Sequence, residues 1–195
     1  MKGPAFDQIV EAIGEKRYKH ILRVTEMAEM LAKIHGVDVE KAKTAALFHD
    51  ICKFKDKDRL WQEARRLQVK DLDSFKAFPQ VLHAYVAAEA ARVDYGIDDE
   101  EILRAIRYHT TGTENMSPVE EVVFLADYLE PMRNFDGVED LRKKAEADLT
   151  EAMAASVQGN LLFLIERGTT IHLDTVRCYN CLLYTSDAAD DSPPV

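Results

Sequence analysis

The stretch TAALFHDICKF, residues 44–54, decides the fold class of this chain. Read as a helix, it is apolar on nearly every side, yet His49 and Asp50 stand next to each other in its middle. Burying an ionised carboxylate without a partner costs several kcal/mol, even after relaxation. The stretch therefore predicts a buried helix whose His-Asp pair faces a compensating positive charge.

Helical periodicity extends over nearly the whole chain. The segment SPVE at 117–120 predicts a helix start, with Ser117 as N-cap and Glu120 closing a capping box, and Asp98 with Glu101 predicts a similar start. Gly36 and Gly96 suit helix C-termini. We expect helices at residues 5–14, 17–35, 38–54, 56–68, 79–95, 98–110, 117–130, 138–147 and 149–167. With no convincing strand pair, the predicted fold is an all-α, single-domain helical bundle.

The composition excludes several classes of protein. A hydrophobic content of 47% in 195 residues is enough for one domain with a real core. The net charge of −10 argues against DNA or anionic-membrane binding, although a local cluster or a metal can still attract a small anion. No apolar run approaches the roughly 20 residues of a membrane span, and three cysteines make no disulfide scaffold. We expect a cytoplasmic protein.

The last twelve residues, YTSDAADDSPPV, differ from the rest of the chain. They are small, polar and acidic, and such a segment cannot bury enough apolar surface to become ordered. We therefore expect a domain at 1–183 and a disordered, non-native tail at 184–195.

Polar residues that suit metal binding lie on apolar faces of five predicted helices. They are His20, His49, Asp50, His83, His109 and Asp127. A single histidine on such a face is usually a core residue bonded to a carbonyl, and a single aspartate near a helix end can be a cap. Their recurrence instead favours a divalent metal at the centre of the bundle, which pairs the carboxylates and accepts imidazole lone pairs.

Three other features stay outside this predicted set. His35 lies in the last turn of its helix beside Gly36, where the helix dipole favours a cation. His172 lies beyond the last predicted helix. The CYNC motif at 178–181 has no second cysteine pair, so a chance spacing explains it better than a zinc site does.

The pattern H…HD…D formed by His20, His49-Asp50 and Asp127 resembles that of the HD-domain metal-dependent phosphohydrolases, which are all-α bundles. His83 and His109 resemble the additional ligands of the dinuclear branch. Residues from about 5 to about 183 are similar to the YqeK-type proteins, which hydrolyse diadenosine tetraphosphate symmetrically to two ADP. The motifs that carry this resemblance are KRYKHILRV, ALFHDICK, HAYVAA, AIRYHTTG, SPVEEVVFLADYLEPMR and FDGVEDLR.

The resemblance implies two metal ions held by the six residues, with Asp50 as the bridging carboxylate. Two metals about 3.5–4 Å apart can hold a hydroxide that attacks phosphorus. Mixed imidazole and carboxylate ligands suit Fe, Mn, Co or Zn, and the resemblance favours iron. The implied partner is a dinucleoside polyphosphate or an ADP-like small molecule.

Lys53 lies one helical turn beyond the His-Asp pair, and HD-x-x-K recurs in the family pattern. We expect its ammonium to act with Asp50 in catalysis and to contact phosphate, rather than to be a surface lysine. The guanidinium of Arg133 suits bidentate phosphate contact, although a rim salt bridge explains it equally well. Thr110, Thr111 and Gly112 follow His109 and could offer donors to the substrate, or could form a simple turn.

Three other functions remain open at this stage: a nucleotidase or other phosphate-ester hydrolase, a di-iron oxygenase on the same scaffold, and a non-catalytic nucleotide-binding module. A homodimer is also left open, since Val119 and Val122 could serve either a subunit interface or the core of one domain.

Overall fold

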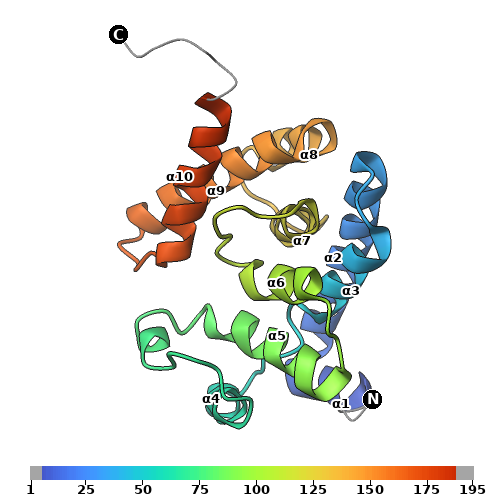
Figure 1. Ribbon diagram of the computed structural model, residues 1–195, viewed down its shortest axis with the longest axis vertical. Coiled ribbons are helices and arrows are strands. Elements are labelled where there is room, and N and C mark those ends of the chain that lie inside the picture. Colours follow the sequence, from blue (N-terminus) through green and yellow to red (C-terminus); the bar gives the residue numbers. More distant parts are fainter. Residues whose placement is uncertain (1–5, 188–195) are drawn as a thin grey trace.

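The computed structural model describes residues 6–187, and the chain is all-α, with no strand among these residues (Figure 1). The described helices are α1 Phe6–Ile13, α2 Glu15–His35, α3 Val39–Phe48, α4 Lys57–Arg66, the 3₁₀ helix η1 Ser74–Lys76, α5 Leu82–Tyr95, α6 Glu100–Tyr108, α7 Pro118–Leu129, α8 Val138–Ala147, α9 Leu149–Glu166 and α10 Leu173–Asp187. The predicted all-α fold is confirmed. None of the described helices has both the length and the apolar content needed to cross a membrane.

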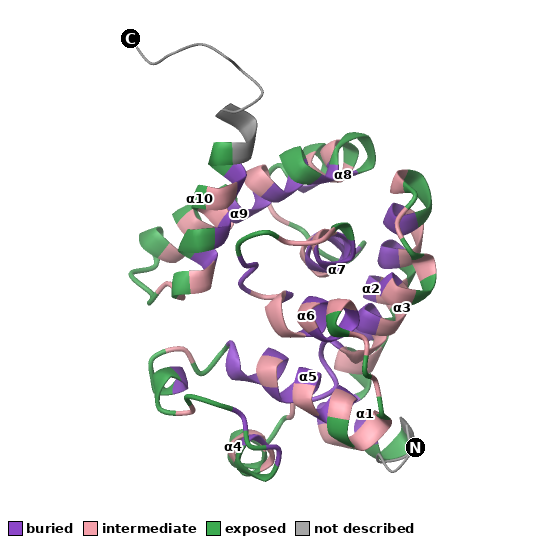
Figure 2. Cartoon of the chain, viewed as in Figure 1, coloured by how far each residue is buried: buried purple, intermediate pink, exposed green. Residues whose placement is uncertain are grey.

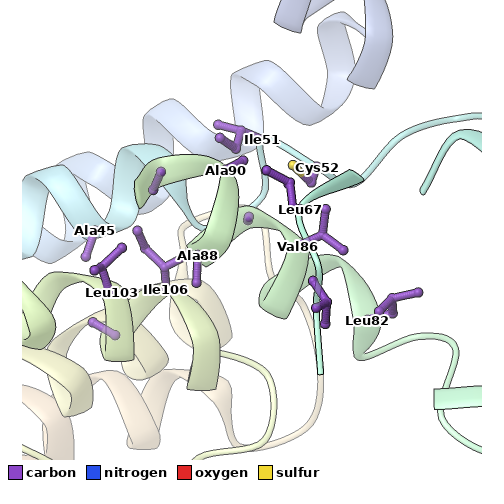
Figure 3. Packing of buried hydrophobic residues seen from close by; sticks show 14 of the residues in the cluster. Ala45, Ile51, Cys52, Leu67, Leu82, Val86, Ala88, Ala90, Leu103 and Ile106 are labelled. Carbon is purple, nitrogen blue, oxygen red and sulfur yellow. The ribbon is translucent and has the colours of Figure 1, made fainter. Parts of the chain in front are cut away.

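Two apolar clusters form the core. One gathers residues of α1, α4, α5 and α6, and the other gathers residues of α7, α8, α9 and α10. Figure 3 shows part of the first cluster, including Val86 of α5 and Ile106 of α6. Helices α2, α3 and α7 contribute side chains to both clusters. These shared helices therefore connect the two clusters, and α7 lies between the other helices (Figure 1).

Helix α7 is buried along most of its length (Figure 2). Val119 and Val122 are both inside the core, so they are not available to a subunit interface. The helix begins with the predicted capping box of Ser117 and Glu120, with Pro118 as its first residue. Its sequence is apolar on nearly all sides because other helices surround it.

Glycine or aspartate marks several other helix ends. Gly36 and Gly96 adopt φ values of 66° and 72° and end α2 and α5, as predicted. The predicted start at Asp98 is wrong by one residue. Asp99 is the N-cap of α6, and its side chain accepts hydrogen bonds from the backbone N–H groups of Glu101 and Ile102.

Other helix boundaries also differ from the prediction. The helix expected at 38–54 ends at Phe48, so His49 and Asp50 lie in the turn that follows it. Helix α10 was not expected, because the apolar pattern of its sequence is weak. The helix is stabilised by packing against α9 (Figure 1). It continues through Asp187, which places the first four of the last twelve residues in a helix. Residues 188–195 of the predicted tail lie outside the described part of the chain.

Candidate metal centre

Five helices bring the six predicted metal ligands together. His20 lies in α2, His83 in the first turn of α5 and Asp127 in the last turn of α7, whereas His49-Asp50 and His109 directly follow α3 and α6. Their ligand atoms form three overlapping groups within which all atoms lie inside 4.8 Å. The groups are His20, His49 and Asp50; His49, His109 and Asp127; and Asp50, His83 and His109.

The Asp50 carboxylate lies at the centre of the cluster and is fully buried. All four histidines point their Nε2 atoms toward it. The distances to Oδ1 are 3.0 Å from His83 and 3.6 Å from His109, and those to Oδ2 are 3.6 Å from His49 and 3.7 Å from His20. Two oxygens with different histidine neighbours suit a carboxylate that bridges two sites.

Three of the histidines are oriented by carbonyl groups three residues earlier in the chain. The Nδ1 of His49 lies 2.6 Å from the Ala46 carbonyl, that of His83 lies 2.9 Å from the Gln80 carbonyl, and that of His109 lies 2.8 Å from the Ile106 carbonyl. Because a carbonyl only accepts, each Nδ1 carries a proton, and in the neutral imidazole the lone pair then lies on Nε2. This is the tautomer that a metal ligand requires at Nε2.

His20 is held by side chains instead. Its Nδ1 lies 3.2 Å from Oε1 of Glu130, and its Nε2 lies 3.0 Å from Oδ1 of Asp127. Asp127 also accepts a hydrogen bond from Nη2 of Arg133 at 2.7 Å. This part of the cluster therefore depends on contacts between α2 and the end of α7.

Several buried polar atoms at the cluster form no hydrogen bond of acceptable geometry among the described residues. They are Nε2 of His20, Nε2 of His49 and Oδ1 of Asp50. An unsatisfied buried group costs about 1–3 kcal/mol, more if charged, so such atoms call for a partner. Imidazole nitrogens and carboxylate oxygens are ligands for first-row divalent metals. The cluster therefore fits divalent metal binding.

The protonation states agree with this fit. Burial lowers the pKa of His49 and of His83 to about 4, so both imidazoles are neutral near pH 7. Burial by itself would raise the pKa of Asp50, but the neighbouring histidines, His49 first, and Lys53 hold it well below the usual range. Burial by itself would also raise the pKa of Asp127, but the nearby imidazoles, that of His20 first, hold it well below the usual range. Neutral imidazoles and ionised carboxylates are the forms that bind metals.

A groove of about 730 Å³ opens beside His20 and Glu130. Its basic residues are Lys16, Arg17, Lys19, Arg23, Lys53 and Arg133. Nη1 of Arg17 lies 2.8 Å from Oδ2 of Asp50, and Nζ of Lys53 lies 3.5 Å from Oδ1 of the same carboxylate. In a chain of net charge −10, this groove is a local basic surface in direct contact with the cluster.

Sequence reasoning missed Arg17, Arg23 and Glu130. A signal was available, because Arg17 and Arg23 each lie three residues from His20, and Glu130 lies three residues after Asp127. Residues at this spacing share a helix face with the predicted ligand.

Thr110, Thr111 and Gly112 do not line the basic groove that Lys53 and Arg133 share. Gly112 has φ 64°, and a Cβ built on it would lie 2.6 Å from Sγ of Cys178 in α10. Close packing against α10 therefore explains this glycine without a ligand. The hydroxyls of Thr110 and Thr111 are buried and have no hydrogen-bond partner among the described residues.

The features excluded from the predicted ligand set also lie apart from the cluster. Nε2 of His35 lies 2.7 Å from the carbonyl of Ala145 and links α2 to α8. His172 packs among aromatic side chains, with its ring centroid 5.0 Å from that of Phe78. It lines a larger cavity of about 1370 Å³ between α4, η1 and the start of α10, which none of the predicted ligands lines.

Comparison with known proteins agrees with this geometry. The HD-domain family matches residues 17–132. The symmetrical bis(5'-nucleosyl)-tetraphosphatase of Halalkalibacterium halodurans is 41% identical and covers 93% of this chain and 97% of its own length. The protein of the same description from Staphylococcus aureus is 38% identical and covers 93% and 94%.

A solved structure supports the fold. The crystal structure of a predicted HD superfamily hydrolase involved in NAD metabolism, from Clostridium acetobutylicum, superimposes with a TM-score of 0.86 at 36% identity and covers 94% of this chain and 99% of its own. The chain belongs to the HD-domain family, within the group of symmetrical bis(5'-nucleosyl)-tetraphosphatases that it matches along nearly its whole length.

Proposed function

We propose that this chain is a metal-dependent hydrolase that cleaves diadenosine tetraphosphate symmetrically into two ADP. The observation that carries this proposal is the buried cluster around Asp50 beside a groove rich in Lys and Arg. The description of the relatives, symmetrical bis(5'-nucleosyl)-tetraphosphatase, supports a dinucleoside polyphosphate as the substrate class.

The bound metal would be held by His20, His49, Asp50, His83, His109 and Asp127, and the favoured content is two ions. Iron is the expected native metal, with manganese, cobalt or zinc able to replace it. When bound, the metal supplies an activated water near neutral pH and neutralises charge on the phosphoryl group. The six donors, and the histidines that face both oxygens of Asp50, support a content of two ions.

The reaction requires attack of water on one of the two central phosphorus atoms. The bond between the attacked phosphorus and the oxygen that bridges it to the other central phosphorus then breaks. That oxygen leaves with the second ADP, so both products are ADP. Lys53 is suited to stabilise the departing ADP, because its ammonium lies beside Asp50 at the inner end of the groove. Arg17 and Arg133 suit bidentate contact with the remaining phosphates.

The polyphosphate chain carries several negative charges, and charge-assisted hydrogen bonds from Arg and Lys are the strong ones. The basic groove offers such donors on both sides of His20, and its apolar residues Phe54 and Met132 offer surface to a base. The arrangement of the charges therefore supports phosphate contact by the groove, while substrate contact by Thr110, Thr111 and Gly112 stays a prediction.

The test is product analysis by chromatography after incubating manganese- or iron-loaded protein with diadenosine tetraphosphate. ADP as the sole nucleotide product, abolished by a chelator and by Asp50→Asn, would support the proposal. AMP together with ATP would exclude symmetric cleavage. A metal-loaded chain that releases no nucleotide would move the search to other phosphate esters, while uptake of oxygen on substrate addition would indicate an oxygenase.

A further inference from the structure

Glu130 has more contacts than a surface carboxylate needs. Its side chain is only 4% exposed. Oε2 accepts from Nε of Arg23 at 2.7 Å and from the backbone N–H of Met132 at 2.8 Å, while Oε1 lies 3.2 Å from Nδ1 of His20 and 3.3 Å from Nη2 of Arg23. Both oxygens of this carboxylate are therefore engaged by groups of the protein itself.

The local sequence explains how Glu130 reaches α2. Pro131 follows it, and a residue before proline avoids helical backbone angles. Helix α7 accordingly ends at Leu129, and Glu130 adopts φ −51° and ψ 152°. Arg23 lies one helical turn after His20, so both α2 side chains meet the same carboxylate.

His20 differs from the other three histidines in what orients its ring. His49, His83 and His109 place Nδ1 against backbone carbonyls, which remain in place after any side-chain substitution. His20 alone among the four relies on a carboxylate from another helix. A free imidazole prefers the proton on Nε2, so without an acceptor at Nδ1 this ring would tend to protonate the nitrogen that faces Asp50 and Asp127.

We propose that Glu130, anchored by Arg23, is a positioning residue that keeps the proton of His20 on Nδ1 and so frees Nε2 to bind metal. The inference rests on the metal site of the proposed function. It assigns the carboxylate of Glu130 no contact with substrate.

An ion-pair network is the competing explanation. His20 lies between two carboxylates, with Asp127 at Nε2 and Glu130 at Nδ1. A doubly protonated imidazolium would satisfy both carboxylates and would bind no metal. The two explanations differ in whether Nε2 carries a proton, and that can be measured directly.

The test uses the full chain labelled with ¹⁵N-histidine, and long-range ¹H–¹⁵N NMR spectra recorded before and after loading with zinc as a diamagnetic probe. We expect His20 to be protonated at Nδ1 alone. In Glu130→Met its proton should move to Nε2 before loading, and zinc affinity measured against a competing chelator should fall about 10- to 100-fold. Glu130→Gln keeps an acceptor oxygen, so it should retain the wild-type tautomer and lose less affinity.

Two further variants keep the test decisive. Glu120→Gln is the matched control, because Glu120 is also a buried carboxylate of α7, but it pairs with Arg104 and should leave His20 and zinc affinity unchanged. If Glu130→Met fails to fold because Arg23 is left unpaired, the double variant Arg23→Met/Glu130→Met removes both charges and must show the same change at His20.

Wild-type His20 protonated on both nitrogens would overturn the inference, and so would a folded Glu130→Met chain with wild-type tautomer and affinity. The outcome is separable from that of the proposed function. A protein that fails to cleave the tetraphosphate but shows the tautomer change would keep the positioning role, whereas an active enzyme insensitive to Glu130 would lose only that role.

Discussion

His49, His83 and His109 form an inner side of the buried His-Asp cluster, and each takes its ring orientation from a carbonyl three residues earlier. His20 and Asp127 form an outer side, where Glu130, Arg133 and Arg23 do the orienting through side chains. The inner histidines are almost completely buried, whereas the Asp127 side chain is 13% exposed and Arg133 is 41% exposed. The inner histidines are therefore oriented by the backbone of their own segments. The outer residues are oriented by side-chain contacts between helices, and they face the groove.

Asp50 joins the two sides, so its substitution should have the largest effect. Asp50→Asn removes the charge that all four histidines face. Metal stabilisation of the transition state is worth several kcal/mol, so we expect a fall in kcat of at least about 10³-fold. Elemental analysis should show that metal content falls with it. Retention of more than a tenth of the activity would show that the cluster is not the seat of the reaction.

Metal removal tests whether both sides depend on the same ions. A ligand present at about 100 times its Kd stabilises the folded state by about 2.7 kcal/mol, which for a chain of this size raises Tm by about 5–10 °C. We expect such a rise when a divalent metal is added back to chelator-treated protein, measured by calorimetry. Asp50→Asn should show none. An equal rise in that variant would place the stabilising metal elsewhere.

Substitutions in the groove should affect substrate without affecting metal. Lys53→Met removes one ammonium beside Asp50, and a charge-assisted hydrogen bond is worth about 1.5–3 kcal/mol, so kcat/KM should fall about 10- to 100-fold. Metal content should stay at the wild-type level. Lys143→Met, at an exposed lysine of α8, is the matched control and should stay within about twofold. A Lys53→Met enzyme as active as this control would remove Lys53 from the reaction.

The smallest effect is expected at Glu121, in the first turn of α7 and outside the six predicted ligands. Burial, Asp148 and Glu120 raise its pKa to about 7, so the folded state binds this proton more tightly than the unfolded chain does. Its contribution to stability is present below about pH 4.5 and is lost as pH rises through about 7. Glu121→Gln should therefore raise the free energy of unfolding at pH 8 by roughly 1–2 kcal/mol, with little change at pH 4. Denaturant titrations at both pH values decide this, and equal stability at pH 8 would contradict it.

Residues of the site could be predicted where they continue a local apolar pattern, and could not where a contact between distant segments places them. His49-Asp50 and His109 directly follow helices whose apolar faces can be read from the sequence, and His20, His83 and Asp127 lie on apolar stripes. Periodicity therefore predicted that all six side chains face the core. Glu130 and Arg23 were missed, because their contact joins residues 107 positions apart, and the local signal was only their three-residue spacing from Asp127 and His20. The periodicity also failed for α10, whose stability comes from packing on α9 rather than from its own pattern.

The two apolar clusters also determine how far the chain can be truncated before its core is exposed. The HD-domain match ends at residue 132, and all six predicted ligands precede that point. Yet Leu125, Leu129 and Val122 of α7 are covered by a cluster completed by α8, α9 and α10, which lie entirely beyond it. An expression fragment ending at 132 would retain every donor atom and present one side of its central helix to water. Such a fragment would be prone to aggregation and proteolysis, so the smallest folding unit extends well past the segment that defines the family.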